Sequence, residues 1–196
     1  MTGDRDYFAA GLELLASGGV RAVTIARLGE ALGLTKGSFY HHFRNVEDYK
    51  TRLLSHWAIE REREVLAAAA AVGNPHDRLD VLIELSIGLP HEAEVAIRSW
   101  ARTDERAWAM RELVDAARER TVREAFLAIG APQQVAEEFG RLAVAVLIGA
   151  QNRSASTDRD GLRQLYRRLT SMALTTSVPG ELSGSSAGER SSSTGS

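Results

Sequence analysis

The scarcity of proline is the feature that most restricts how this chain can fold. Only 4 of its 196 residues are proline, and apolar residues recur at helical spacing over the long segments between them. Proline interrupts helices, whereas an apolar period of about 3.6 residues is typical of helices that bury one face. No segment shows the alternation that is typical of a half-buried strand. The sequence therefore predicts an all-α fold.

Start and stop signals divide the chain into about nine predicted helices. Thr24, Thr35 and Asn45 each stand where a side-chain oxygen can cap a first helical turn, and Gly18-Gly19 and Gly33 can end helices. The predicted helices lie at about residues 8–17, 25–32, 36–43, 46–72, 75–88, 92–102, 105–129, 135–146 and 162–173.

Helix lengths and composition predict two domains and a tail. Residues 1–45 contain three short helices, and residues 46–177 contain the longer ones. Residues 178–196 are mostly glycine and serine with a few charged residues, so they offer little apolar surface to offset the entropy of ordering, and we expect them to be disordered.

Charge and cysteine content exclude several classes of protein. The formal net charge is −2, so the chain as a whole is not a basic nucleic-acid binder, although residues 20–56 contain six basic and three acidic residues, a local charge of +3. The chain has no cysteine, which excludes disulfides, thiol nucleophiles and cysteine-ligated metals. We find neither a signal peptide nor an apolar stretch long enough to span a bilayer, so we expect a cytoplasmic protein without membrane contact.

The second and third predicted helices have the layout of a helix-turn-helix. Gly29 and Gly33 supply the small residues that the turn needs, and Phe39 and Phe43, four residues apart, face the core. The opposite face of the third helix then carries hydrogen-bond donors that can reach phosphates and base edges in a major groove. Gly37 keeps this helix thin, which allows its backbone to approach DNA closely.

The segment from Thr24 to Tyr49 resembles the DNA-binding segment of the tetracycline-repressor (TetR) family. The specific part is the run Gly-Leu-Thr-Lys-Gly-Ser-Phe-Tyr-x-x-Phe at residues 33–43. More loosely, residues 97–101 and 104–106 are similar to a C-terminal domain type of that family. The resemblance implies a homodimeric regulator, usually a repressor, which binds operator DNA and whose C-terminal domain binds a small-molecule inducer.

The resemblance also implies which residues contact DNA. The positions that match the family's base or phosphate contacts are Lys36, Ser38, Tyr40, His41 and His42, with phosphate contacts near Thr24 and Thr35. The chain departs from the family at Val46, where a lysine is usual. Arg44 or Lys50 could replace that phosphate contact.

Ligand binding and dimerisation are assigned to the C-terminal helices. Apolar walls with few polar groups suit a ligand cavity, and the candidate lining residues are Trp57, Ser86, Trp100, Trp108, Met110 and Phe126, against the alternative of ordinary core packing. The eighth and ninth helices have apolar stripes, and two copies of each can form a four-helix dimer interface. Small residues of the eighth helix, among them Ala143, Ala145 and Gly149, would allow close approach.

Other functions have weaker support in the sequence. We identify no catalytic constellation, so we predict that the protein is not an enzyme, and we expect no cofactor. His56 and Glu60 have the spacing of a metal-binding pair, but one pair is more common as a surface contact, so we expect no metal site. The alternatives that remain are an activator on the same fold and a helical small-molecule or protein-binding module without DNA binding.

Overall fold

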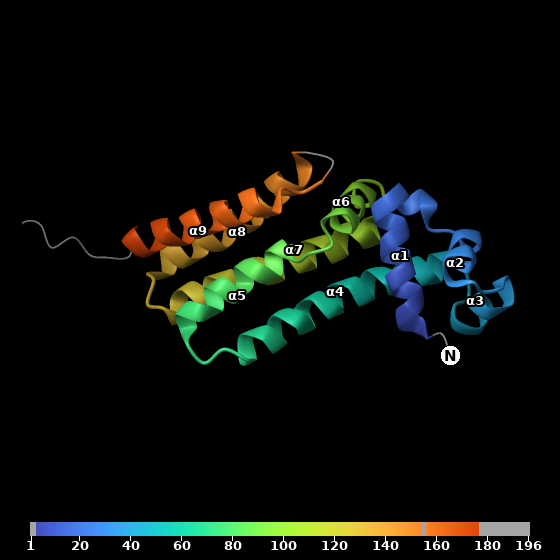
Figure 1. The fold of residues 1–196 in the computed structure, drawn as a ribbon, viewed down its shortest axis with the longest axis horizontal. Coiled ribbons are helices and arrows are strands. Elements are labelled where there is room, and N and C mark those ends of the chain that lie inside the picture. Colours follow the sequence, from blue (N-terminus) through green and yellow to red (C-terminus); the bar gives the residue numbers. More distant parts are fainter. Residues whose placement is uncertain (1–2, 154–155, 177–196) are drawn as a thin grey trace, which may run out of the picture.

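The computed structural model describes residues 3–153 and 156–176, and the regular secondary structure in this part is entirely helical (Figure 1). The α-helices are α1 (Asp4–Gly18), α2 (Ile25–Leu32), α3 (Lys36–His42), α4 (Val46–Ala70), α5 (Pro75–Ile87), α6 (His91–Trp100), α7 (Glu105–Ala128), α8 (Gln133–Asn152) and α9 (Arg159–Thr176). The all-α prediction is confirmed.

The molecule is elongated, with α1, α2 and α3 at one end and α8 and α9 towards the other (Figure 1). The two longest helices, α4 and α7, pack against each other and run along the molecule between these ends. Helix α6 packs on α1, and α8 packs on both α7 and α9. Both long helices therefore extend from the neighbourhood of α3 into the C-terminal helices.

Side-chain caps define the helix starts that the sequence predicts. Thr24 Oγ1 accepts a hydrogen bond from the backbone N–H of Arg27, and Thr35 Oγ1 accepts one from Ser38, each at 3.3 Å. Asn45 caps α4 in the same way, with its Oδ1 2.8 Å from the N–H of Asp48. At the end of α2, Gly33 has a φ of 65°, a left-handed conformation that favours glycine.

One apolar core joins α1–α4 to α6 and the first half of α7. It is built around buried aromatic side chains, and its largest members include Tyr7, Phe39, Phe43, Tyr49 and Trp57. Two further clusters fill the C-terminal helices, and their largest members include Phe126, Phe139 and Tyr166. The first core crosses the predicted domain boundary at residue 45, because α4 contributes to it along its first three turns.

The structure differs from the predicted helices in a few details. Helices α3, α4, α5, α6 and α7 end one or two residues earlier than predicted, as is common where the last turn of a helix frays. Helices α1, α8 and α9 begin earlier and end later than the apolar residues that predicted them. A short 3₁₀ helix at Val20–Ala22 was not predicted. On α2, Leu28 is fully buried, and Ile25 and Leu32 are half-buried and pack against the same core. The predicted disordered tail at 178–196 lies outside the described residues.

Candidate nucleic-acid interface and ligand cavity

The turn between α2 and α3 is held by a close backbone contact. The N–H of Leu34 donates to the carbonyl of Gly29 at 2.8 Å. A β-carbon at Gly29 would lie 2.8 Å from the carbonyl oxygen of Leu34, so this position needs glycine. The contact sets the angle between the two helices, as the helix-turn-helix layout requires.

Helix α3 has one buried and one exposed face. Phe39 and Phe43 are each 2% exposed and anchor the helix on the core, whereas Tyr40 is 57% exposed. The exposed predicted contacts on or beside this helix are Lys36, Gly37, Tyr40 and His41, together with the capping residues Thr24 and Thr35 and the following Arg44. Apart from Gly37, these residues carry side chains with positive charge or hydrogen-bond donors, as contacts with phosphates and base edges require.

Two predicted contact residues of α3 instead turn towards α1. The Tyr7 hydroxyl donates to Ser38 Oγ at 3.3 Å, and His42 Nδ1 lies 2.7 Å from Asp4 Oδ1. Both Ser38 and His42 are half-buried. Their contacts assign them at least a positioning role for α3, while direct contact with DNA stays a prediction.

Asp4, His42 and Arg52 form a clamp that no sequence pattern predicted. Arg52 pairs with Asp4 Oδ2, donates to the backbone carbonyl of His42 at 2.9 Å, and stacks with its guanidinium carbon 4.8 Å from the centre of the Phe43 ring. The clamp ties the C-terminal end of α3 to α1 and α4. Asp4 is 38 residues from His42 and 48 from Arg52, so no local sequence signal reveals it.

Lys50 lies in a different position from the one that the sequence suggested. Its ammonium group pairs with Glu47 at 3.0 Å, and its side chain is only 16% exposed. Val46, where the TetR family usually has lysine, is half-buried at the start of α4. Of the two replacements considered for that lysine, the exposed Arg44 is therefore the better placed.

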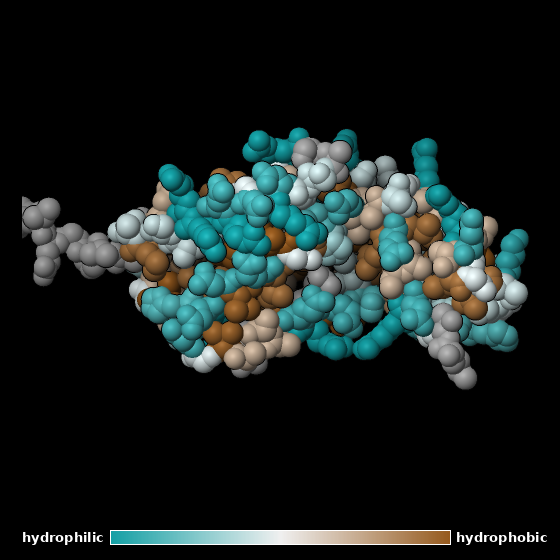
Figure 2. All heavy atoms as spheres, in the orientation of Figure 1, coloured by the Kyte–Doolittle hydropathy of each residue, from teal (hydrophilic) through white to brown (hydrophobic). Residues whose placement is uncertain are grey.

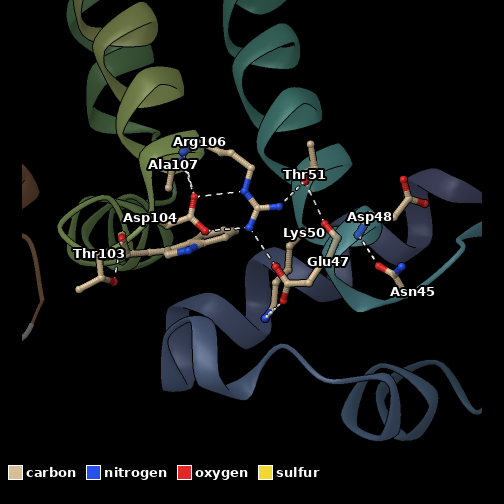
Figure 3. A network of polar contacts seen from close by, with 10 residues as sticks. Asn45, Glu47, Asp48, Lys50, Thr51, Thr103, Asp104, Arg106 and Ala107 are labelled. Carbon is tan, nitrogen blue, oxygen red and sulfur yellow. Dashed lines mark hydrogen bonds and ion pairs between the residues drawn. The ribbon is translucent and has the colours of Figure 1, made fainter.

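A polar network joins the start of α7 to the start of α4 (Figure 3). Arg106 donates to Asp104 Oδ2 at 2.8 Å, to Glu47 Oε2 at 2.9 Å and to Thr51 Oγ1 at 3.0 Å. Hydrogen bonds from Arg106 and from two backbone N–H groups lower the pKa of Asp104 to about 2, and the bond from Arg106 lowers the pKa of Glu47. Arg106 thus links the two long helices beside α3.

A cavity of about 290 Å³ lies between α4, α5, α7, α8 and α9. Most of its wall is aliphatic, with polar groups at a few points. The aliphatic residues include Leu79, Leu82, Ile83, Val114, Val122, Val144, Leu147 and Leu169, and the polar ones include Ser86, Arg118, Thr121, Tyr166 and Thr170. Its volume is at the lower end of the range of about 300–1,000 Å³ for small-molecule sites.

Two of the six predicted ligand residues, Ser86 and Phe126, line this cavity. Trp57, Trp100 and Met110 instead belong to or pack against the core beside α1, and Trp57 also borders a second hollow of about 230 Å³. Trp108 is 53% exposed on α7. Trp57 and Trp100 do not line the cavity because they fill the junction between the helix-turn-helix and the C-terminal helices.

Behind the cavity wall lies a buried polar cluster. Glu94, 1% exposed, accepts two hydrogen bonds from Arg118, at 2.5 and 3.1 Å, and one from the side-chain amide of Gln151 at 3.0 Å. His91 is also buried, and burial lowers its pKa. Its Nε2 lies 3.2 Å from the carbonyl of Ile87, and its Nδ1 lies 3.3 Å from Gln151, which fits a neutral ring protonated on Nε2.

Helices α8 and α9 leave apolar side chains on the surface. Leu142 on α8 and Leu165 on α9 are each 47% exposed, and Ala145 and Gly149 extend the exposed stripe of α8. Apolar patches also reach the surface between hydrophilic ones over this half of the molecule (Figure 2). Ala143 points inward and lines the cavity, contrary to its predicted place in a dimer interface.

A helix-turn-helix with an exposed third helix, followed by a long connecting helix and a cavity-containing helical body, defines the class of helix-turn-helix regulators. Residues 8–48 match the family described as "Bacterial regulatory proteins, tetR family". This match covers the helix-turn-helix and the start of α4, so it assigns the N-terminal domain to the tetR type. The DNA-binding type of the N-terminal domain is thereby established.

Curated and solved relatives agree with this assignment. Over 89 residues the chain is 33% identical to the HTH-type transcriptional repressor KstR2 of Mycobacterium tuberculosis, and the match spans 43% of either chain. A transcriptional regulator from Rhodococcus has a TM-score of 0.71 at 19% identity, covering 91% of this chain and all of that one. A regulator from Saccharomonospora viridis, solved with choline, has a TM-score of 0.70 at 18% identity, with coverages of 86% and 95%. These two structures show the shared fold.

Membrane-spanning helices and metal-binding clusters are both absent from the described part of the chain. Within residues 3–153 and 156–176, no helix is long and apolar enough to cross a membrane. Over the same residues, no three histidine, aspartate or glutamate side chains form a group that could hold a metal ion.

Proposed function

We propose that the protein is a homodimeric transcriptional repressor that binds a palindromic operator and is released from it by a small-molecule inducer. The observation that carries the proposal is the exposed face of α3, where Lys36, Tyr40 and His41 project opposite the buried Phe39 and Phe43. The KstR2 relative is a repressor by name, which supports the same role here. Binding would place α3 in the major groove, with phosphate contacts that make the affinity depend on salt.

Dimerisation is supported by the exposed stripe on α8 and α9. Leu142, Ala145 and Gly149 share one side of α8 and are exposed, so a second copy could approach that helix closely. Two helices from each copy would form a four-helix interface with two-fold symmetry. That symmetry would match an operator with two inverted half-sites.

The substitution Leu142→Glu tests the interface. Placing a charge in the buried centre of the contact should yield monomers in analytical ultracentrifugation and abolish operator binding. Ile59→Glu is the matched control, because Ile59 is 59% exposed but lies on α4. Val146 is less suitable, since it packs partly against the core of its own chain. A Leu142→Glu protein that remains dimeric would place the interface elsewhere.

Release by an inducer is supported by the position of the cavity. Ala58 and Val65 of α4 line it together with Val114 and Thr121 of α7, and the same two helices meet beside α3 through Arg106. A ligand that binds one arrangement of α4 and α7 more tightly than the other would shift the two recognition helices of a dimer. The change in operator affinity cannot exceed the difference in the ligand's binding free energy between the two arrangements. A structural neighbour was solved in complex with choline, so a regulator of this fold can bind a small molecule.

The function is tested by passing sheared host DNA over the purified protein at moderate salt and sequencing what is retained. Enrichment around one inverted repeat would support a sequence-specific dimeric regulator. Placing that repeat upstream of a reporter gene then separates the repressor, which lowers expression, from the activator alternative. If folded, ligand-free protein enriches no DNA sequence, the helical binding module is favoured. The replacement of the family's usual lysine by Val46 supports that alternative.

Lys36→Gln then tests the contact face. Lys36 is exposed, so its replacement should leave the free energy of unfolding within about 0.5 kcal/mol. Operator binding should weaken, and the dependence of affinity on salt should become shallower by about one unit for each phosphate that the protein no longer neutralises. Arg63→Gln is the control, because Arg63 lies about 25 Å further along α4 than Val46. An unchanged salt dependence for Lys36→Gln would remove this residue from the interface.

A further inference from the structure

The groups that line the cavity restrict the chemical class of the ligand that it can bind. This inference rests on the proposed function, in which the cavity binds the inducer. The charged lining residues Glu64, Arg120 and Glu124 are exposed and lie at the rim. The polar groups further inside are Arg118 and the hydroxyls of Ser86, Thr121, Tyr166 and Thr170. What these inner groups already bind decides which ligand they can accept.

The guanidinium of Arg118 is already paired with carboxylates that lie outside the cavity. Glu94 takes hydrogen bonds from both of its terminal nitrogens, and Asp115 lies 3.7 Å from one of them. Asp115 itself is held by two 2.7 Å hydrogen bonds from Arg98. Arg111 also pairs with Asp115, at 3.7 Å, and with Glu112. Three carboxylates therefore face three guanidinium groups, so this side of the cavity presents no net charge.

This balance disfavours charged ligands. A ligand carboxylate could pair with Arg118 only by displacing Glu94, which is 1% exposed and would become an unpaired buried charge. A ligand ammonium group would meet a Glu94 that is already saturated by Arg118 and Gln151. A neutral ligand leaves the cluster intact.

Three hydroxyl groups that line the cavity donate hydrogen bonds to backbone carbonyls. Ser86 donates to Leu82 at 2.9 Å, Thr121 to Ala117 at 3.0 Å, and Tyr166 to Ala143 at 3.2 Å. Burial raises the pKa of Tyr166 to about 12, so its phenol keeps that proton at neutral pH. The Ser86 hydroxyl also lies within hydrogen-bonding reach of the Tyr166 phenol, so the two oxygens are neighbours on the wall. Because each donates its own proton to a carbonyl, together they offer lone pairs to a ligand that donates a hydrogen bond.

We propose that the cavity binds a neutral, mostly aliphatic alcohol, whose hydroxyl donates to the oxygen of Ser86 or Tyr166 while its hydrocarbon part lies against the leucine, isoleucine and valine side chains. A ketone of the same size has no proton to donate, and a fatty acid or amine carries the charge that the wall disfavours. The volume of about 290 Å³ suits a small molecule of this class.

The test compares four probes with the same number of carbons: 1-octanol, 2-octanone, octanoate and octylamine. Binding to the full chain is measured by isothermal titration calorimetry at pH 7.4, without DNA. We expect 1-octanol to bind at least tenfold more tightly than octanoate and octylamine, and about threefold to tenfold more tightly than 2-octanone. Octanoate or octylamine binding as tightly as 1-octanol would overturn the proposal, as would the failure of 1-octanol to bind.

Four variants locate the binding. Ala117 lines the cavity and Ala116 is exposed beside it on α7, so Ala117→Phe should abolish 1-octanol binding and Ala116→Phe should leave it unchanged. Ser86→Ala should lower the affinity for 1-octanol by about threefold to tenfold and leave the affinity for 2-octanone unchanged. Glu94→Gln should free Arg118 and tighten octanoate binding at least threefold, with folding checked by circular dichroism. Equal binding of 1-octanol to the Ala116→Phe and Ala117→Phe variants would exclude the cavity.

Binding and release are measured separately, so the two proposals can fail separately. If 1-octanol binds as expected but does not release operator DNA, the ligand class stands and induction by such a ligand fails. If operator DNA is bound specifically while none of the four probes binds the protein, the ligand class is wrong and the DNA-binding function is unaffected.

Discussion

The clamp at the end of α3 makes a prediction that separates positioning of the recognition helix from its direct contacts. Asp4 bridges His42 and Arg52, so Asp4→Ala breaks both interactions with one change. The side chains of Asp4, His42 and Arg52 are 38%, 27% and 42% exposed. Polar contacts at this exposure contribute about 0.2–1 kcal/mol each, so the two together contribute about 0.4–2 kcal/mol.

Asp6→Ala provides the matched control. Asp6 also lies in the first turn of α1, where its carboxylate accepts a hydrogen bond from the N–H of Gly3 at 2.8 Å, but it is not part of the clamp. Both variants remove one negative charge from the start of α1, with the same loss of interaction with the helix dipole and the same change in charge near DNA. Asp6→Ala also removes its hydrogen bond to Gly3, so the difference in operator affinity, rather than in stability, measures the clamp.

We expect both variants to lower the free energy of unfolding in urea, Asp4→Ala through the clamp and Asp6→Ala through the helix cap. Operator affinity, measured by fluorescence anisotropy, should fall for Asp4→Ala relative to Asp6→Ala by up to about tenfold per subunit, because about 1.4 kcal/mol corresponds to a factor of ten. Equal operator affinity of the two variants would refute a role of the clamp in positioning α3.

Four further predictions concern the body of the protein. Gly140→Ala should destabilise by about 1–3 kcal/mol in urea unfolding, because its β-carbon would lie 2.8 Å from the carbonyl oxygen of Glu119 on α7. The ionised Asp104, whose pKa is lowered, stabilises the fold above pH 4, and this contribution is lost as the pH falls towards 2. The free energy of unfolding of the wild type should therefore fall more than that of Asp104→Asn between about pH 4.5 and 3. Arg106→Ala should reduce but not abolish the effect of a bound ligand on operator affinity. Trp57→Phe should alter thermal stability but not ligand affinity in calorimetry, because Trp57 lies in the core beside α1.

Local signals in the sequence predicted the helices and the recognition face. Thr24, Thr35 and Asn45 cap their helices through side chains that bond to N–H groups within three residues, so neighbouring residues alone reveal each start. The four-residue spacing of Phe39 and Phe43 likewise fixes the buried side of α3. These interactions are determined by helix geometry, which the sequence pattern encodes directly.

The cavity and the clamp depend on how distant helices are rotated against each other, which no local pattern encodes. Trp100 has the apolar character expected of a pocket wall, but α6 packs on α1 and so places it in the core. Glu94 and Arg118 are ordinary helix residues in the sequence, and only the packing of α6 on α7 and α8 makes them a buried pair. For the same reason Ala143 was placed on the wrong side of α8.

The magnitudes indicate which contacts would carry a response from the cavity to α3. Arg106 and Glu47 are 47% and 55% exposed, so their pairing contributes at most about 1 kcal/mol. Ligands typically change the affinity of a second site by about 1–3 kcal/mol, which this one surface pair cannot supply alone. The remainder must come from the packed surfaces of α4 and α7, which line the cavity at Val65 and Val114. For this reason the loss of Arg106 should weaken the response, whereas filling the cavity from Ala117 should remove it.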